Sequence, residues 1–486
     1  MKFFSAGRLL FSLFLILYLP SSLSASEGLF GDLNQPPLLV NIDNPNFRKL
    51  VIAIPDFLVG PSHKTAEAMR FAKEGPKELA RLLQFSAMFN VMSNDAYKNL
   101  ESELEKKFTT SLKPLLNDPG MSTVEGIDLV QWKAIGVESL VVGEIEAEQN
   151  QLIFKFHLFD ILRGKKIGGK KFSGIAPNDY ISVMRRVADL IMEAYTGKRG
   201  IFRSKITFVG RRTKNAAKQI YVCDFDGSNA IQITSGNYIH ISPHFSPDGR
   251  YVTYTSYENK NPDLFVYDLV EGKKRKLSAE KGINSGGKWA PNGKLIAFTG
   301  SIRADADIYT IEPDGANRKK LISGQGLDVD PAFSPNEKWI AWVSGRFGNP
   351  HIFVGSLVWD NATNPRVTSD LRLTYAGWYN ATPSWSPESD KILFAGYDKD
   401  INRWDVFVIN SDGKQLERLT LKKGNNESPS WAPNGQLIVF QSNRVDDQDV
   451  LGRYQLWIMN RDGSGQRHLP TGIYEAMTPD WSNALY

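Results

Sequence analysis

The stretch Phe245-Ser-Pro-Asp-Gly249 recurs through the second half of the chain and decides the fold. Each copy has an aromatic residue, Ser or Ala, Pro, and then an acidic or amide residue. The other copies are Trp289-Ala-Pro-Asn-Gly293, Phe333-Ser-Pro-Asn-Glu337, Trp385-Ser-Pro-Glu388, Trp431-Ala-Pro-Asn-Gly435 and a shortened Pro479-Asp-Trp481-Ser482. Their aromatic residues lie 44, 44, 52, 46 and 50 residues apart. Periods of this length are typical of propellers and other repeat folds.

Two β-rich runs follow each copy of the motif. After the second copy they are Leu295-Ile-Ala-Phe-Thr299 and Asp307-Ile-Tyr-Thr-Ile311. A turn such as Asp314-Gly315 then leads into a basic segment, which we expect to be an outer strand. Apolar and polar residues alternate along these runs, and this pattern favours strands over helices. The sequence therefore predicts four strands in each repeat.

The repeat is out of phase with the region that contains it. The first unit lacks its opening strand and begins at Ile206-Thr-Phe-Val209, whereas only an opening strand is left at 478–482. Five complete units and two complementary fragments make six blades. Joining the fragments seals the ring and removes two unpaired sheet edges. We therefore predict an all-β six-bladed propeller over 201–486, closed by the C-terminal strand.

Residues 38–200 are predicted to form an α/β domain in front of the propeller. We expect strands at 38–42, 50–54, 139–143, 152–159 and 166–172. Helices are expected over 64–85, with a break at Gly75-Pro76, and over 127–135. A further helix begins near Pro177 and ends at Gly197. Its apolar stripe contains Ile181, Met184, Val187, Ala188, Ile191 and Tyr195.

The first 26 residues have the pattern of a secretory signal. Lys2 and Arg8 precede an apolar run at 9–19, and small residues follow at 21–26. We expect export, cleavage of residues 1–26 and a flexible arm at 27–37. The formal net charge of +5 is too small to indicate nucleic-acid binding. With Cys223 as the single cysteine, an internal disulfide is excluded.

The sequence lacks a recognisable catalytic set. It has no Gly-x-Ser-x-Gly nucleophile motif, and the spacing of its six histidines does not indicate a metal site. We therefore predict a protein that is not an enzyme and has no metal or cofactor. Two alternatives remain open. One is a propeller-type hydrolase using Asp328 and Asp330, and the other is a peptidoglycan- or carbohydrate-binding protein using Trp378 and Tyr379.

One mouth of the propeller is the predicted binding surface. The residues at the start of each innermost strand are mainly polar with apolar insertions, a composition that suits recognition. The candidate partner-binding residues are His240, Asn284, Asp328, Asp330, Asn380, Thr382, Asn426, Glu427 and Met477.

Two upstream stretches add a family resemblance to the repeats. Asp128-Leu-Val-Gln-Trp132-Lys-Ala-Ile-Gly136 and Tyr195-Thr-Gly-Lys-Arg-Gly-Ile-Phe202 resemble the N-terminal domain of the TolB family and its entry into the first blade. That family is the periplasmic component of the bacterial Tol-Pal envelope system. The resemblance covers nearly all of the chain beyond the signal.

The resemblance implies a periplasmic scaffold that supports outer-membrane integrity and constriction at cell division. It implies that the propeller mouth binds Pal, a peptidoglycan-associated lipoprotein, and so gives a peripheral association with the outer membrane. An inner-membrane protein, TolA, would bind the segment that contains Leu38, Leu39, Val40, Asn41, Ile42 and Asp43. The chain departs from the family in the extra residues 27–37, which leaves the mode of TolA docking open.

Overall fold

The computed structural model of the chain describes residues 48–110, 127–148, 150–301, 305–421, 424–445 and 452–483, with only the backbone described for 107–110. The predicted strand at 38–42, the signal and the arm lie outside this part. The first part is a mixed sheet in the order β3-β1-β4-β5-β6, with β2 beside β4. Its strands are β1 (Leu50–Ala53), β2 (Leu58–Val59), β3 (Phe89–Val91), β4 (Ser139–Glu148), β5 (Gln151–Asp160) and β6 (Lys165–Ile175).

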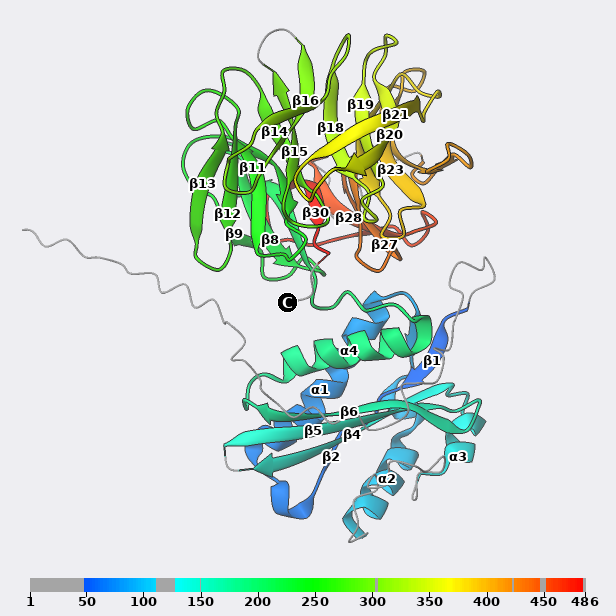
Figure 1. Cartoon of the computed structure of the whole chain (residues 1–486). Coiled ribbons are helices and arrows are strands. Elements are labelled where there is room, and N and C mark those ends of the chain that lie inside the picture. Colours follow the sequence, from blue (N-terminus) through cyan, green and yellow to red (C-terminus); the bar gives the residue numbers. More distant parts are fainter. Residues whose placement is uncertain are drawn as a thin grey trace, which may run out of the picture.

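Helices cover both faces of this sheet (Figure 1). They are α1 (Ala66–Phe85), α2 (Lys98–Thr110), α3 (Leu129–Ala134) and α4 (Tyr180–Thr196), with short 3-10 turns at Pro61–His63 and Asn94–Ala96. Buried side chains of α1 and α4 pack on one face and those of α2 and α3 on the other. The predicted stripe of α4 is buried except for Ile181, which is 43% exposed. We did not predict α2 or β3.

The predicted break at Gly75-Pro76 is wrong, because α1 runs without interruption through Pro76. Proline cannot donate the usual hydrogen bond to the carbonyl four residues earlier. Here the carbonyl of Ala72 accepts the N–H of Phe57 at 3.0 Å instead. Gly75 admits the same ring, since a Cβ there would lie 2.7 Å from Phe57 Cε2. A partner from outside the helix therefore satisfies the carbonyl that the proline leaves free.

The second part is the predicted six-bladed propeller, with four antiparallel strands in each blade. Blade 1 contains β30 (Glu475–Trp481), β7 (Lys205–Arg211), β8 (Gln219–Asp224) and β9 (Ile231–Gln232). Blade 2 contains β10 (His240–Phe245), β11 (Tyr251–Ser256), β12 (Asp263–Asp268) and β13 (Lys273–Ser278), and blade 3 contains β14 (Asn284–Trp289), β15 (Ile296–Ser301), β16 (Ala306–Ile311) and β17 (Lys319–Ile322).

The remaining blades have the same strand order from the axis outward. Blade 4 contains β18 (Asp328–Phe333), β19 (Trp339–Ser344), β20 (His351–Trp359) and β21 (Pro365–Arg372). Blade 5 contains β22 (Tyr379–Trp385), β23 (Lys391–Asp398), β24 (Arg403–Asn410) and β25 (Glu417–Arg418), and blade 6 contains β26 (Asn426–Trp431), β27 (Leu437–Ser442), β28 (Gln455–Asn460) and β29 (Arg467–His468). The long β20–β21 hairpin explains the 52-residue spacing between two of the motifs.

The C-terminal strand closes the ring as predicted. β30 pairs with β7, so that Trp481 lies opposite Ile206 and Glu475 lies opposite Arg211. The N–H of Ser482 donates to the carbonyl of Lys205 at 2.9 Å. The paired strands β7 and β30 are therefore more than 260 residues apart in the sequence.

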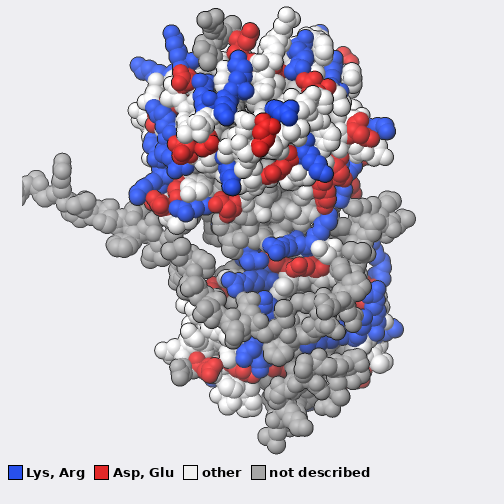
Figure 2. Space-filling model, in the orientation of Figure 1, with Lys and Arg blue, Asp and Glu red and all other residues white. Residues whose placement is uncertain are grey.

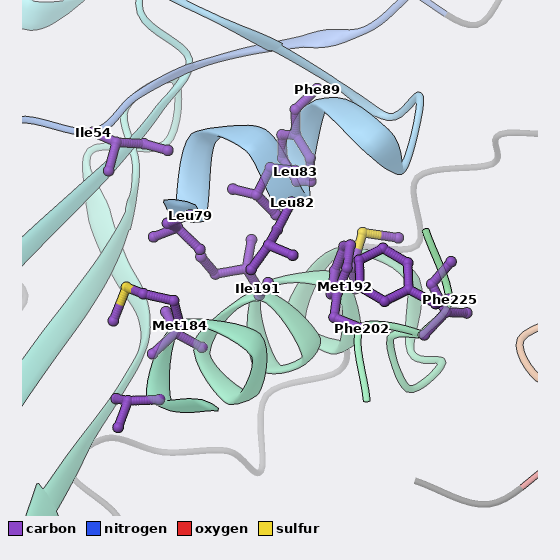
Figure 3. Close-up of a cluster of buried hydrophobic side chains, with 14 of the residues drawn as sticks. Ile54, Leu79, Leu82, Leu83, Phe89, Met184, Ile191, Met192, Phe202 and Phe225 are labelled. Carbon is purple, nitrogen blue, oxygen red and sulfur yellow. The ribbon is translucent and has the colours of Figure 1, made fainter. Parts of the chain in front are cut away.

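The α/β part packs against one end of the propeller (Figure 1). The ring of Phe225, at the β8–β9 turn, contacts Phe85 of the α/β part with ring centroids 4.9 Å apart, and Phe202 with centroids 5.4 Å apart. Figure 3 shows Phe202 and Phe225 beside Met192 of α4, within one continuous apolar cluster. A shared core therefore holds the two parts together.

Candidate functional site

The two ends of the propeller differ in what they face. The six innermost strands end near the α/β part. This is shown at the end of β30, where the neighbouring Asp224 and Asp226 of blade 1 bond to Arg185 and Arg81 of the α/β part. We call this end the proximal mouth. The same strands begin at the opposite end, the distal mouth, which carries the predicted binding residues.

Three of the predicted residues are buried amides that hold loops in place. Asn284, Asn380 and Asn426 are at most 1% exposed. Their Nδ2 atoms donate to carbonyls of the loop just before each strand: Asn284 to Glu280 at 2.7 Å, Asn380 to Ala376 at 2.9 Å and Asn426 to Gly424 at 3.2 Å. Buried polar groups need such partners. These amides shape the distal loops from below and do not reach a partner directly.

Asp328 and His240 occupy the same strand position and are also buried. Asp328 Oδ1 accepts from Trp342 Nε1 at 3.0 Å and lies 3.4 Å from Arg346 Nη2. This carboxylate is 0% exposed and is closed to a substrate, which weakens the hydrolase alternative. The imidazole of His240 packs edge-on against Tyr254. Gln219 of blade 1 instead contacts the loop before His240 and donates to the Gly236 carbonyl at 2.8 Å.

The other four predicted residues, Asp330, Thr382, Glu427 and Met477, are partly exposed on the innermost strands. Every innermost strand contains a β-bulge near this point. At the bulge each strand has one residue with a positive φ, and five of the six are not glycine: Ser242, Asp330, Thr382, Ser428 and Thr478, with Gly286 as the sixth. Bulges redirect side chains and backbone groups. In this propeller the bulge recurs at the same point of all six blades.

A cavity of about 400 Å³ lies in the propeller at the proximal mouth. His244, Lys288 and Asp480 line one side of it, and Ala332, Ser384 and Ser430 line another. Asp480 Oδ1 lies 3.2 Å from His244 Nδ1, and Asp480 Oδ2 accepts the Phe245 N–H at 3.0 Å. Burial alone would raise the pKa of Asp480, but His244 and Lys288 outweigh it and hold that pKa below its ordinary value. The pair ties the closing strand to blade 2.

The distal mouth has an apolar rim that the predicted residue set missed. Large apolar side chains, each at least 38% exposed, stand on its loops. We call this set the distal rim: Tyr238, Ile239, Tyr257, Ile283, Phe347, Tyr375, Trp378, Ile401, Leu421 and Val445. Exposed apolar patches on a folded domain mark surfaces that bind other molecules. The sequence could have indicated the rim, because these apolar residues lie in the loops directly before or after the aligned strands of the repeat.

Two aromatic residues of the rim have cationic neighbours. Tyr375 is 74% exposed and Trp378 is 47% exposed. Lys399 Nζ lies 4.2 Å from the Trp378 ring centroid, and Arg372 Cζ lies 4.7 Å from that of Tyr375. A cation over a ring face attracts the ring by about 0.5–1 kcal/mol at an exposed site. Trp and Tyr side chains are typical anchors of protein interfaces.

Two further findings concern metal-binding clusters and membrane-spanning helices. Within the described ranges, no three His, Cys, Asp or Glu side chains come together in a way that suits a metal ion. The helices of the same ranges include none long and apolar enough to span a membrane. The predicted segment 38–43 lies outside the described residues, so its contacts stay a prediction.

This architecture places the chain among proteins in which an α/β region precedes a closed six-bladed propeller. Residues 192–485 match the family profile described as the TolB beta propeller domain, and residues 107–167 match the TolB amino-terminal domain. The chain belongs to the TolB family.

Similar proteins support this assignment. The Tol-Pal system protein TolB of Desulfosudis oleivorans is 34% identical over 279 residues, which cover 57% of this chain and 56% of that protein. That of Roseobacter denitrificans is 30% identical over 255 residues, 52% of each chain. The chain thus spans about half the length of these curated relatives. The crystal structure of TolB from Acinetobacter baumannii shares the fold, with a TM-score of 0.70 and 22% identity over 90% of this chain and 97% of that one.

Proposed function

We propose that the chain is a non-enzymatic, periplasmic scaffold of a Tol-Pal envelope system. Its distal mouth binds a Pal-like peptidoglycan-associated lipoprotein, and its segment 38–43 binds a TolA-like inner-membrane protein. The observation that carries the first contact is the distal rim, whose exposed rings include Tyr375 and Trp378. Through these two partners the protein supports outer-membrane integrity and constriction at division.

The exposed and the buried residues at the distal mouth have different roles in this proposal. The rim side chains supply apolar area and aromatic anchors, which dominate binding energy at protein interfaces. The buried amides Asn284, Asn380 and Asn426 set the loop shapes from beneath. Asp330, Thr382, Glu427 and Met477 are partly exposed on the innermost strands. The buried amides of the predicted set thus act in the proposal as supports of the binding loops.

Replacing Trp378 with alanine is expected to weaken binding of a Pal ectodomain by about ten-fold or more. The change removes a ring that is 47% exposed without opening a core cavity. Trp339→Ala is the matched control, since Trp339 is 37% exposed at the start of β19, away from the distal mouth. Calorimetric titration of each variant with Pal measures the effect. Equal affinities for the two variants would contradict a Pal site at the distal rim.

Deleting residues 27–46 is expected to abolish TolA binding while Pal binding stays within about two-fold. An extended segment of this kind can pair with the edge of a partner's sheet, so that backbone hydrogen bonds supply the affinity. Affinity capture from envelope extract with the whole and the shortened protein tests both contacts together. Retention of TolA by the shortened protein would move the TolA site elsewhere.

A further inference from the structure

The cavity at the proximal mouth is lined by a ring of equivalent residues, one from each blade. Each innermost strand contributes the residue directly before the aromatic residue of the repeat motif. We call this set the cavity ring, which from blade 1 to blade 6 is Asp480, His244, Lys288, Ala332, Ser384 and Ser430. The ionisable side chains come from blades 1 to 3 and the small ones from blades 4 to 6. The small side chains leave space on the half of the ring that faces the ionisable ones.

The backbone N–H of each motif aromatic points toward the axis of the propeller. The residue after it donates its own N–H outward to the second strand of the blade, as Ser334 does to the Trp339 carbonyl at 2.9 Å. Along an antiparallel strand the hydrogen-bonding side alternates from residue to residue. In the described sheets each innermost strand pairs only with its second strand. The N–H of the aromatic residue therefore faces the cavity.

In two blades this inward N–H is bonded to the cavity-ring residue of the preceding blade. Trp481 N–H donates to Ser430 Oγ at 3.0 Å. Phe245 N–H donates to Asp480 Oδ2, also at 3.0 Å. A cavity-ring residue that has an acceptor atom can therefore satisfy the N–H of the next blade.

Blades 4 and 5 lack this bond, because the cavity-ring residue before each of them cannot accept it. The Lys288 ammonium is only a donor, and Ala332 has no polar side-chain atom. Phe333 and Trp385 are buried, and their N–H groups have no acceptor among the described residues. Buried backbone N–H groups normally have a partner. These two therefore favour an acceptor that is held in the cavity.

Lys288 adds a positive charge to the same cavity. On the outside of the propeller, Lys and Arg lie among Asp and Glu (Figure 2), and many form ion pairs, such as Lys274 with Glu258 and Lys320 with Asp307. Lys288, by contrast, forms no ion pair and no hydrogen bond with any described residue. An available cation and two available N–H groups in one cavity suit an anion.

The acidic groups near Lys288 limit the charge that a ligand can carry. Asp480 pairs with His244, and Asp330 accepts the Thr382 N–H. Both carboxylates also interact electrostatically with Lys288. They repel a doubly charged anion such as phosphate more strongly than a singly charged one. A carboxylate carries a single charge and has two oxygens that can accept from several donors.

We propose that the proximal cavity binds the carboxylate group of a small organic anion. Lys288 supplies the positive charge, and the N–H groups of Phe333 and Trp385 donate to the carboxylate oxygens. The cavity volume of about 400 Å³ lies within the roughly 300–1,000 Å³ of small-molecule sites. The site lies at the opposite end of the propeller from the distal rim, so it adds a ligand that the proposed function does not include.

Isothermal titration calorimetry of the full chain with acetate and with succinate tests the proposal. Both anions are expected to bind saturably at one site, and Lys288→Met is expected to weaken binding about ten-fold or more, because a charge-assisted bond is lost. Lys294→Met removes the same charge from an exposed turn of the same blade and should leave the affinity unchanged. Absence of saturable binding, or equal affinities for the two variants, would overturn the proposal.

A second variant tests the N–H groups without changing the charge. Ala332→Ser places a hydroxyl where it can accept the Trp385 N–H, as Ser430 accepts that of Trp481. We expect carboxylate binding to weaken about three-fold or more, because this N–H is no longer available. Unchanged binding would contradict the role of the Trp385 N–H.

Two further probes test the class of ligand. Inorganic phosphate is expected to bind more weakly than succinate, and tighter binding of phosphate would overturn the choice of a carboxylate. A Gly-Glu-Gly peptide with blocked ends presents the same group on a protein side chain. If this peptide bound more tightly than succinate, the ligand would be an acidic side chain of a protein, and the small-molecule site would be wrong.

Discussion

Replacing Trp481 with alanine is expected to lower the free energy of unfolding by about 4 kcal/mol. Trp481 lies on the closing strand β30 and is 3% exposed. Its Nε1 donates to Ser204 Oγ at 2.7 Å, and its backbone N–H donates to Ser430 Oγ at 3.0 Å. The substitution leaves a cavity where blade 1, blade 6 and the entry to the propeller meet. Urea unfolding followed by circular dichroism measures the change.

The exposed Trp378 provides the control for this prediction. Trp378→Ala removes the same side chain from a distal loop and is expected to change the free energy of unfolding by less than about 1 kcal/mol. A drop of similar size in both variants would mean that loss of any tryptophan, and not opening of the seam, determines the result. Trp481→Ala with wild-type stability would show that the ring does not depend on its closing strand.

The fold could be predicted from the sequence because its units repeat. The sequence of one blade by itself does not define its strands. The aromatic and Pro residues recur at the same point of every unit, however, and so fix where each innermost strand ends. The incomplete first and last units then leave only one way to close the ring. The break predicted at Pro76 failed for the opposite reason, since Phe57, which satisfies the freed carbonyl of Ala72, lies outside the helix. A window of local sequence does not reveal such a tertiary partner.

The candidate site was harder to predict because position along a strand does not tell which way a side chain points. The aligned positions of His240, Asn284, Asp328, Asn380 and Asn426 were identified, but loops cover them and leave them buried. A bulge in each innermost strand then changes the direction of the residues that follow. The exposed rim residues, such as Tyr375 and Trp378, stand in loops whose length varies between blades.

One turn position of the repeat indicates which blade contacts the α/β part, and we did not predict this contact. The turn after the third strand ends in Asp-Gly in four blades, and the residue before that pair is Phe225 in blade 1 but Pro313, Ser411 and Arg461 in blades 3, 5 and 6. Only the blade 1 turn packs against the α/β part among these four. An apolar residue at a turn position that is otherwise polar or proline marks the blade that faces a neighbouring domain.

Asp224→Asn, next to that turn, is expected to lower the free energy of unfolding at pH 7 by about 2 kcal/mol. Burial alone would raise the pKa of Asp224, but Lys205 and Arg185 outweigh it and lower that pKa from 3.8 to about 2. A carboxylate with a depressed pKa stabilises the folded state above its unfolded pKa, and the contribution disappears as the pH falls through the folded pKa. The free energies of unfolding of wild type and variant should therefore converge between about pH 4 and pH 2 in urea unfolding.

Glu312→Gln, at the matching turn of blade 3, removes a carboxylate that bonds only Asn317 among the described residues and should have little effect. A gap between Asp224→Asn and wild type that persists at pH 2 would show that the ion pairs of Asp224 do not hold the junction.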